Sequence, residues 1–280
     1  MSLPAFVIDA PIGPDTRYGL LDAAVGPMPM DKHAIAPGAT WWSQACGGAH
    51  LYPPQCATPP YPSFTMDPGD GLIASYSFVV YASEVCTPIG SEYDAAKARI
   101  AERFRLGESR AVEQALWGGG GGVTGVFEQI HAVTPITTLT ATTTAEAVSL
   151  LEQQIAGTSA YNGQVMIHAR PRMSAYFAKN QLMRARVPSD QRDLYSWFGS
   201  KMVFGSGYPG KSPAGVAPTG TGETIYGTSR ILLWREEGPL FFSPPEVLDR
   251  TTNQRGIYAA RAYMLGIECD VAAVTLDPRT

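Results

Sequence analysis

The strongest pattern of apolar and polar positions in the chain has a helical period and covers residues 91–117. Apolar residues recur there every three or four positions: Tyr93, Ala96, Ile100, Phe104, Ala111 and Ala115. Ser91 is a favourable N-cap residue, and Asp94 follows as a capping-box variant. Because five consecutive glycines begin at Gly118, the pattern predicts a helix of about 40 Å that ends at Trp117.

Weaker patterns predict a mixture of strands and helices in the rest of the chain. Thr143 and Glu146 form a capping box for a helix that stops at Gly157, and Pro171 favours the start of a helix reaching Met183. Strands are predicted at 72–86, 164–168, 200–204, 224–236 and 257–276, the last as one long or two short strands. This order, without an internal repeat, predicts an α+β fold.

Residues 1–70 differ from the rest because they contain more than half of the 23 prolines and show no helical period. Proline fixes φ and cannot donate to a strand ladder, so this stretch is not expected to build its own core. It nevertheless carries Trp41, Trp42 and Tyr52, which are large side chains that favour burial. We therefore expect an extended arm whose aromatic residues lie at contacts between subunits.

Composition narrows the class of protein further. The 280 residues suffice for a sizeable core, but only 16% are charged, so much of the surface must be uncharged. The net charge of −4, without a basic block, argues against non-specific nucleic-acid binding through a global positive field. Four cysteines do not make a disulfide scaffold, and neither a secretory signal nor a membrane-length apolar run is visible. A soluble protein of the reducing cytoplasm is expected.

Residues 205–212 match the phosphate-binding expression G-x-x-x-x-G-K-[ST] at every position. In a P-loop the lysine, here Lys211, reaches the β and γ phosphates, and the serine, here Ser212, holds Mg²⁺. A strand is predicted before the loop, but the stretch that follows, PAGVAPTGTGE, has two prolines and three glycines, which disfavour the required helix. We interpret the segment as a glycine- and proline-rich loop and keep a P-loop nucleotide hydrolase as an alternative.

Metal and catalytic patterns are weak. Cys46, His50 and Cys56, with His33 upstream, contain zinc-ligand residue types, but the spacing is not that of a zinc finger. His168 lies in a predicted buried strand, where a hydrogen-bonded core imidazole is expected. No G-x-S-x-G or H-E-x-x-H motif occurs. We therefore predict no catalytic residue, no cofactor, no metal site and no enzymatic activity.

The charged residues of the predicted long helix indicate a surface that faces solvent or another subunit. Arg99 and Arg103 join Trp41, Trp42 and Tyr52 as candidate subunit-interface residues. An alternative is that Arg99, Arg103 and Arg110 face a packaged polyanion.

The series of elements resembles a known family. A proline-rich start is followed by an extended segment ending in SYSFVVYASEVC and by the long capped helix. The helix from Thr143, QVMIHARPRMSAYF, WFGSKMVFGSGYPG and the late strands TIYGTSRILLWREE and DRTTNQRGIYAARAYMLGIECDVAAVTL complete the series. In this order the elements resemble the major capsid proteins of tailed bacteriophages (Hong Kong ninety-seven-type fold), a fold shared with encapsulins.

The resemblance implies five regions within a phage capsid-type α+β fold. They are an N-terminal arm (1–30), an extended loop (31–88), a spine helix with peripheral domain (89–140), an axial domain (141–245) and a return strand to the peripheral domain (246–280). The family has no catalytic residues to transfer, so none is assigned.

The function that the resemblance implies is that of a major capsid protein. Such a protein assembles with itself, as hexamers and pentamers, into the icosahedral head that encloses phage double-stranded DNA. Scaffolding, portal and decoration proteins are further expected partners, with non-specific contact to packaged DNA and none to a membrane. The expected location is the virion, after assembly in the bacterial host cytoplasm. The alternatives are an encapsulin-type compartment shell and a minor head or vertex protein of the same fold.

Overall fold

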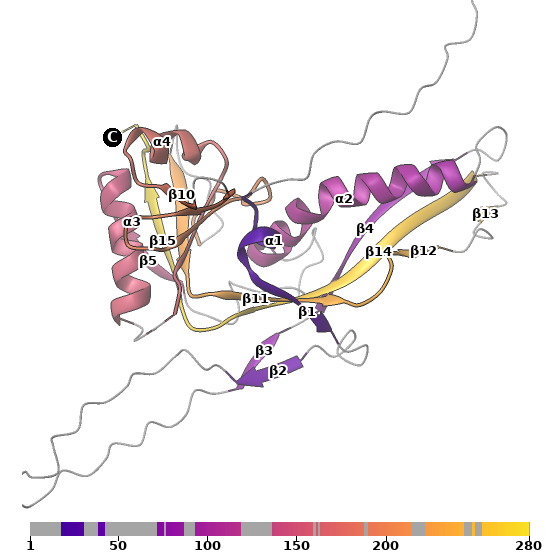
Figure 1. Cartoon of the computed structure of the whole chain (residues 1–280), viewed down its shortest axis with the longest axis horizontal. Coiled ribbons are helices and arrows are strands. Elements are labelled where there is room, and N and C mark those ends of the chain that lie inside the picture. The colour runs from indigo at the N-terminus through magenta and orange to yellow at the C-terminus, as the bar shows by residue number, and fades with distance from the viewer. Residues whose placement is uncertain are drawn as a thin grey trace, which may run out of the picture.

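The computed structural model is elongated and contains two main β-sheets that lie side by side (Figure 1). The long helix α2 (Tyr93–Gly118) lies along the first sheet, and α3 (Thr144–Gln153) and α4 (Met173–Lys179) lie beside the second. The structure describes residues 18–30, 39–42, 72–75, 77–86, 93–118, 136–158, 161, 163–187, 190–213, 222–243, 248–249 and 254–279.

The first sheet is built around β14 (Gln254–Ile267), which pairs antiparallel with four strands. These are β4 (Ser77–Cys86), β11 (Ile231–Glu236), β12 (Phe241–Phe242) and β13 (Leu248–Asp249). The strand β1 (Val25–Met30) joins the edge, parallel to β11. Side chains alternate along β4: Phe78 and Val80 are buried in the core, whereas Val79 and Tyr81 point outward.

The second sheet has seven strands in the order β5-β15-β10-β6-β9-β8-β7. Their bounds are β5 Thr137–Thr140, β6 Met166–Ala169, β7 Arg184–Val187, β8 Asp190–Tyr195, β9 Lys201–Phe204, β10 Glu223–Thr228 and β15 Val271–Leu276. All described side chains of β6 and β10 are buried, because both strands lie in the middle of the sheet. A separate two-stranded ribbon consists of β2 (Ala39–Trp42) and β3 (Leu72–Ser75).

The two sheets share two chain segments, which was not predicted. Residues 224–236 were predicted as one strand, but the chain turns at Ser229 and Arg230, so that β10 belongs to the second sheet and β11 to the first. The neighbouring segment does the same: β14 belongs to the first sheet, where it pairs with β11, and β15 belongs to the second sheet, where it pairs with β10. At the crossing Arg230 pairs with Glu268 (Nη2 to Oε1, 2.8 Å), and the Arg230 N–H donates to the Tyr161 hydroxyl at 2.9 Å. Cys269, at the same turn, is disulfide-bonded.

One hydrophobic core reaches across both sheets. It includes Phe104, Leu116 and Trp117 of α2, together with residues of the first sheet such as Phe78 and Tyr263 and residues of the second sheet. The second-sheet members are Met166, Val203, Tyr226, Val271 and Ala273. A second core lies between that sheet and the helices α3 and α4. The C-terminal end of α2 is therefore buried at the junction between the sheets.

The helices form where the capping pattern predicts, with altered ends. The Thr143 hydroxyl accepts from the Glu146 N–H at 3.2 Å and begins α3, which continues into a π-helical turn, Gln154–Thr158. The helix predicted from Pro171 to Met183 is shorter and covers only α4, because Gln181 has a φ of +55° and the chain leaves the helix at Asn180. Within the predicted proline-rich arm, the short helix α1 (Leu20–Ala23) and β1 were missed, and Leu20 is fully buried.

Candidate subunit interface

The two neighbouring tryptophans of β2 have different surroundings. The Trp41 ring lies 5.8 Å from the Trp234 ring, and its Nε1 donates to the Ser75 hydroxyl at 2.9 Å. It also packs against Gly266, where a Cβ atom would come within 2.6 Å of the Trp41 ring. Trp42 is 63% exposed. We expected a lone subunit to expose both rings, but Trp41 packs on the chain's own first sheet, and Trp42 is the ring available for contact.

The two candidate arginines, Arg99 and Arg103, form hydrogen bonds to β4 of the same chain. Arg99 donates to Glu84 of β4 (Nη2 to Oε1, 2.6 Å), and Arg103 donates to the Ser83 carbonyl at 2.7 Å and to Glu84 at 3.4 Å. Both side chains are substantially exposed, so these contacts connect α2 to β4 at the surface and contribute little to stability. Tyr52 lies outside the described residues.

The outer face of the first sheet carries exposed apolar residues that the sequence analysis did not single out. Val79, Tyr81 and Val85 alternate outward along β4, and Tyr258 of β14 and Phe241 of β12 lie on the same face. The Phe241 and Tyr258 rings are 6.0 Å apart. The sequence signal for these residues was the alternation within SFVVYASEVC. Every second residue points to the face opposite that of the buried Phe78 and Val80.

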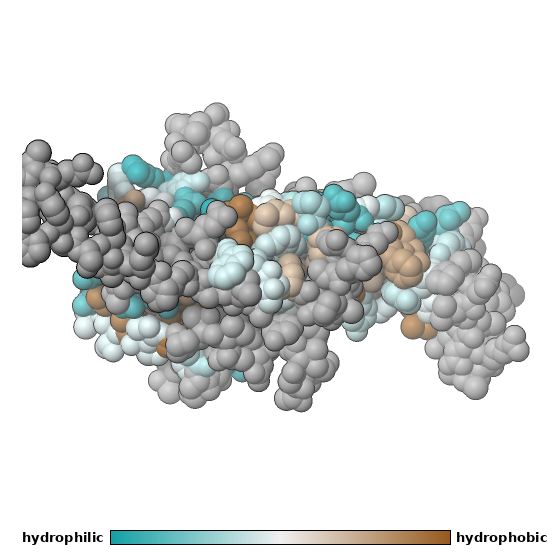
Figure 2. Space-filling model, turned by 90° about the horizontal axis from the view of Figure 1, so that it is seen from below, coloured by the Kyte–Doolittle hydropathy of each residue, from teal (hydrophilic) through white to brown (hydrophobic). Residues whose placement is uncertain are grey.

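Further hydrophobic residues reach the surface in several places. Figure 2 shows them on the underside of the molecule, separated by paler and more polar residues. Trp197 and Phe198 are also exposed, in the turn before β9. Arg184 lies over the Trp197 ring at 5.2 Å. Hydrophobic residues exposed singly in this way are ordinary on a protein surface, whereas Tyr81, Tyr258 and Phe241 lie on one face of the first sheet.

The P-loop-like segment has a packing explanation. The predicted preceding strand is β9, and residues 205–213, which are the described part of the loop, contain no helix. A Cβ atom at Gly207 would collide with the Arg110 carbonyl and lie 2.6 Å from the Glu113 Cβ atom, and one at Gly205 would lie 2.6 Å from Glu113 Oε2. The glycines let the loop approach α2 closely.

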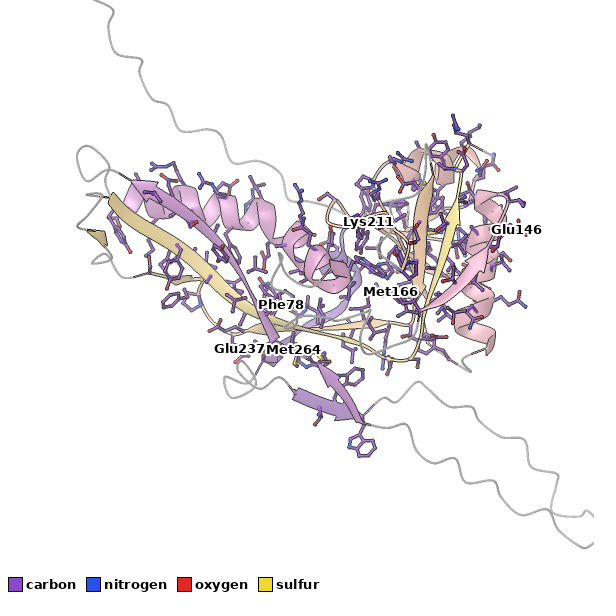
Figure 3. All side chains as sticks on the ribbon, turned by 180° about the vertical axis from the view of Figure 1, so that it is seen from behind. Phe78, Glu146, Met166, Lys211, Glu237 and Met264 are labelled. Carbon is purple, nitrogen blue, oxygen red and sulfur yellow. The ribbon has the colours of Figure 1, made fainter. Side chains whose placement is uncertain are left out.

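Lys211 lies on this loop near the junction of the sheets, and its carbonyl accepts from the Tyr226 hydroxyl (Figure 3). Gly210, with a φ of +61°, packs on the Arg170–Glu223 pair. Glu223 is fully buried and also binds Arg172, so two arginines hold one carboxylate beside the loop.

We expect Lys211→Ala to leave assembly unchanged and expect no nucleotide to bind the wild type. The physical reason is that the Gly205, Gly207 and Tyr208 N–H groups already donate to acceptors within the chain and are not free to hold a phosphate. Isothermal calorimetry with ATP and Mg²⁺ measures this directly. A dissociation constant in the micromolar range, lost in Lys211→Ala, would restore the hydrolase alternative.

Buried titratable groups are held by hydrogen bonds. His168 lies between the Tyr208 hydroxyl and the Thr228 hydroxyl, each at 2.9 Å, and burial lowers the pKa of its imidazole to about 3. The expectation of a hydrogen-bonded core imidazole is therefore confirmed. Glu113 is 1% exposed, and burial raises the pKa of its carboxyl group although three donors oppose this effect.

Neither a metal-binding cluster nor a membrane-length apolar helix is found among the described residues. Within the described ranges, no group of three or more His, Cys, Asp or Glu side chains is arranged to hold a metal ion. The candidate residues His33, Cys46, His50 and Cys56 lie outside those ranges. No helix among the residues that the structure describes is long and apolar enough to cross a membrane.

The sequence matches no protein-family model and no curated protein, whereas solved structures resemble the fold over nearly its full length. The capsid of the native GTA particle, computed with C5 symmetry, aligns with a TM-score of 0.56 at 10% identity, covering 96% of this chain and 99% of that chain. The chain has a phage capsid-type fold. A structure of Mycobacterium phage Ogopogo (TM-score 0.54, 14% identity) covers 98% of this chain and 97% of its own. A structure of Gordonia phage Cozz aligns with a TM-score of 0.54 at 12% identity and covers 98% of this chain and 91% of that chain.

In this capsid-type fold, α2 is the helix that the sequence predicted as the spine helix. The predicted α+β class is confirmed. The five region boundaries stay predictions, as does the assignment of Trp41, Trp42, Tyr52, Arg99 and Arg103 to a subunit interface.

Proposed function

We propose that the protein is a major capsid protein that assembles with itself into the icosahedral head enclosing phage double-stranded DNA. The observation that carries this proposal is the alignment with the GTA particle capsid, which covers 96% of this chain and 99% of that one. Because the match spans both chains almost completely, it concerns the whole subunit rather than a single shared domain.

The surface of the subunit supports the same proposal. Trp42, Tyr81 and Phe241 expose large apolar rings that an isolated subunit leaves in water. A closed shell repeats a few contacts between identical copies, so modest apolar contacts become strong through their number. The role is structural rather than enzymatic, with hexamers and pentamers as the assembling units.

The partners beyond the shell follow from the proposed role. A phage head takes scaffolding, portal and decoration proteins, and its inner surface meets packaged DNA without sequence preference. We place the protein in the virion, after assembly in the cytoplasm of a bacterial host.

We expect the purified protein to form large closed particles, alone or with a scaffolding protein. The reason is that the exposed apolar rings gain burial only in contact with other copies. Light scattering and negative-stain microscopy measure particle size and closure. A stable monomer under every assembly condition would contradict the proposal. Particles from the native source that hold a protein cargo instead of DNA would favour the encapsulin-type shell.

A further inference from the structure

Residues 18–24 run between the second sheet and α2 and are hydrogen-bonded to both. The Phe204 N–H of β9 donates to the Tyr18 carbonyl at 2.7 Å, and the Lys201 ammonium donates to the Asp22 carbonyl at 3.2 Å. Between these two contacts, the Leu20 N–H donates to Glu113 Oε1 of α2 at 3.2 Å. From Val25 the chain continues as β1 into the first sheet. This segment therefore contacts α2 and both sheets.

Glu113 receives hydrogen bonds from three separate parts of the chain. Besides the Leu20 N–H, the Ser109 hydroxyl donates to Oε1 at 3.2 Å, and the Gly207 N–H donates to Oε2 at 2.8 Å. We call Glu113 and these three donors the Glu113 cluster. Because the carboxylate is buried, each donor replaces water that the charge would otherwise bind.

Three glycines close around the same carboxylate. A Cβ atom at Gly19 would lie 2.5 Å from the Ser109 hydroxyl and 2.7 Å from Glu113 Oε1. Gly205 and Gly207 of the 205–208 turn approach Glu113 as closely. The carboxylate thus fills the space between residues 18–24 and the turn at 205–208 and touches both. If either segment moves away, water enters beside a charged group that the other segment also binds.

Two further groups near Glu113 bear on its charge. Arg110, one residue beyond Ser109 on α2, favours the ionised carboxylate, whereas the neighbouring Tyr208 hydroxyl is held neutral by burial. Tyr208 in turn contacts His168 in the middle of the second sheet at 2.9 Å. The Tyr208 hydroxyl is therefore close enough to Glu113 to be affected by its charge and is also hydrogen-bonded inside that sheet.

We propose that the Glu113 cluster is a conformational lock that couples residues 18–24 to the 205–208 turn, so that release of one segment from α2 loosens the other. The inference concerns the single subunit and does not require the capsid function to be correct.

Hydrogen exchange of the full-length protein, resolved to single amides, tests this lock. Glu113→Gln keeps the side-chain volume but places an NH₂ group among N–H donors, so the Leu20 and Gly207 amides should exchange roughly tenfold faster or more, about 1.4 kcal/mol at the usual conversion. Amides of β10 and β15 should be unchanged. Glu102→Gln, the same change at a more exposed position of α2, is the matched control and should alter neither amide.

Coupling requires a second variant that leaves the carboxylate intact. Lys201→Met removes the ammonium contact with the Asp22 carbonyl, which is at the other end of the 18–24 segment. The lock predicts faster exchange at Gly207 as well as at Leu20. Faster exchange at Leu20 alone would overturn the proposal, because the two segments would then open independently. Lys201→Met gives the decisive result even if Glu113→Gln fails to fold.

Discussion

Trp42→Ala is expected to abolish shell assembly at subunit concentrations that assemble the wild type, while the isolated subunit stays folded. Trp42 is 63% exposed, so its removal takes little from the chain's own packing. Burying an aromatic side chain covers roughly 150 to 250 Å², worth several kcal/mol at about 25 cal/mol per Å². Because each copy repeats the contact, the loss multiplies over the shell.

Trp41→Ala is the matched variant, and its effect should differ in kind. Trp41 packs on Trp234 and Gly266 and donates to Ser75, so its loss should lower the melting temperature of the isolated subunit. Circular dichroism melting of both variants, with particle counts by negative stain, separates the two effects. If Trp42→Ala assembles normally, the ring does not lie at a contact between subunits.

Gly207→Ala is expected to destabilise the subunit by about 3 kcal/mol or more, which corresponds to a fall in melting temperature of roughly 6 to 12 °C for a chain of this size. The added methyl group would collide with the Arg110 carbonyl, which is helix backbone and cannot turn aside. Moving the loop away would also break the bond from the Gly207 N–H to the buried Glu113.

Gly107→Ala is the control, because it makes the same substitution within α2, the helix on which Gly207 packs. Apart from the backbone of α2 itself, no heavy atom lies within 4 Å of the position where its Cβ atom would be, and alanine favours a helix over glycine by about 0.5 to 1 kcal/mol. Its melting temperature should therefore rise. Equal melting temperatures for wild type and Gly207→Ala would show that the loop does not pack on α2 as described.

Local signals predicted the elements with strong local causes. The period of residues 91–117 and the capping pair Thr143 and Glu146 led to helices α2 and α3 within a few residues of their ends. The division of 224–236 into two strands could not be predicted in this way. Thr228 to Ile231 carries no glycine or proline, and the turn there is fixed by Arg230 bonding to Glu268, which lies 38 residues later.

The start of the chain shows a second limit of local patterns. Proline content led to the expectation of an arm without a core, yet Leu20 lies at the centre of the main core and β1 pairs with β11. Both features arise from contacts with residues more than 90 positions away, such as Glu113. Propensity alone carries no information about such partners.

The candidate subunit interface was predicted only in part, because the surroundings of its residues depend on partners that are distant in the sequence. Exposure of Trp42 follows from its position on a ribbon away from the core, but the difference between Trp41 and Trp42 depends on Trp234 and Gly266, which no local pattern reveals. Likewise, the glycines at positions 205 and 207 fit a phosphate-binding loop and close packing on a helix equally well. Only the position of Glu113 and Arg110 beside the loop decides between them.

The crossing of the two sheets has a mechanical consequence. The segments β10–β11 and β14–β15 each run from one sheet into the other through a short turn. They pair with each other on both sides of that turn. A force that pulls the sheets apart along these strands would load many backbone hydrogen bonds in shear at once, instead of opening them singly. The turn at Arg230 and Glu268 is where the pairing is interrupted, so the subunit should bend there under load before its strands separate.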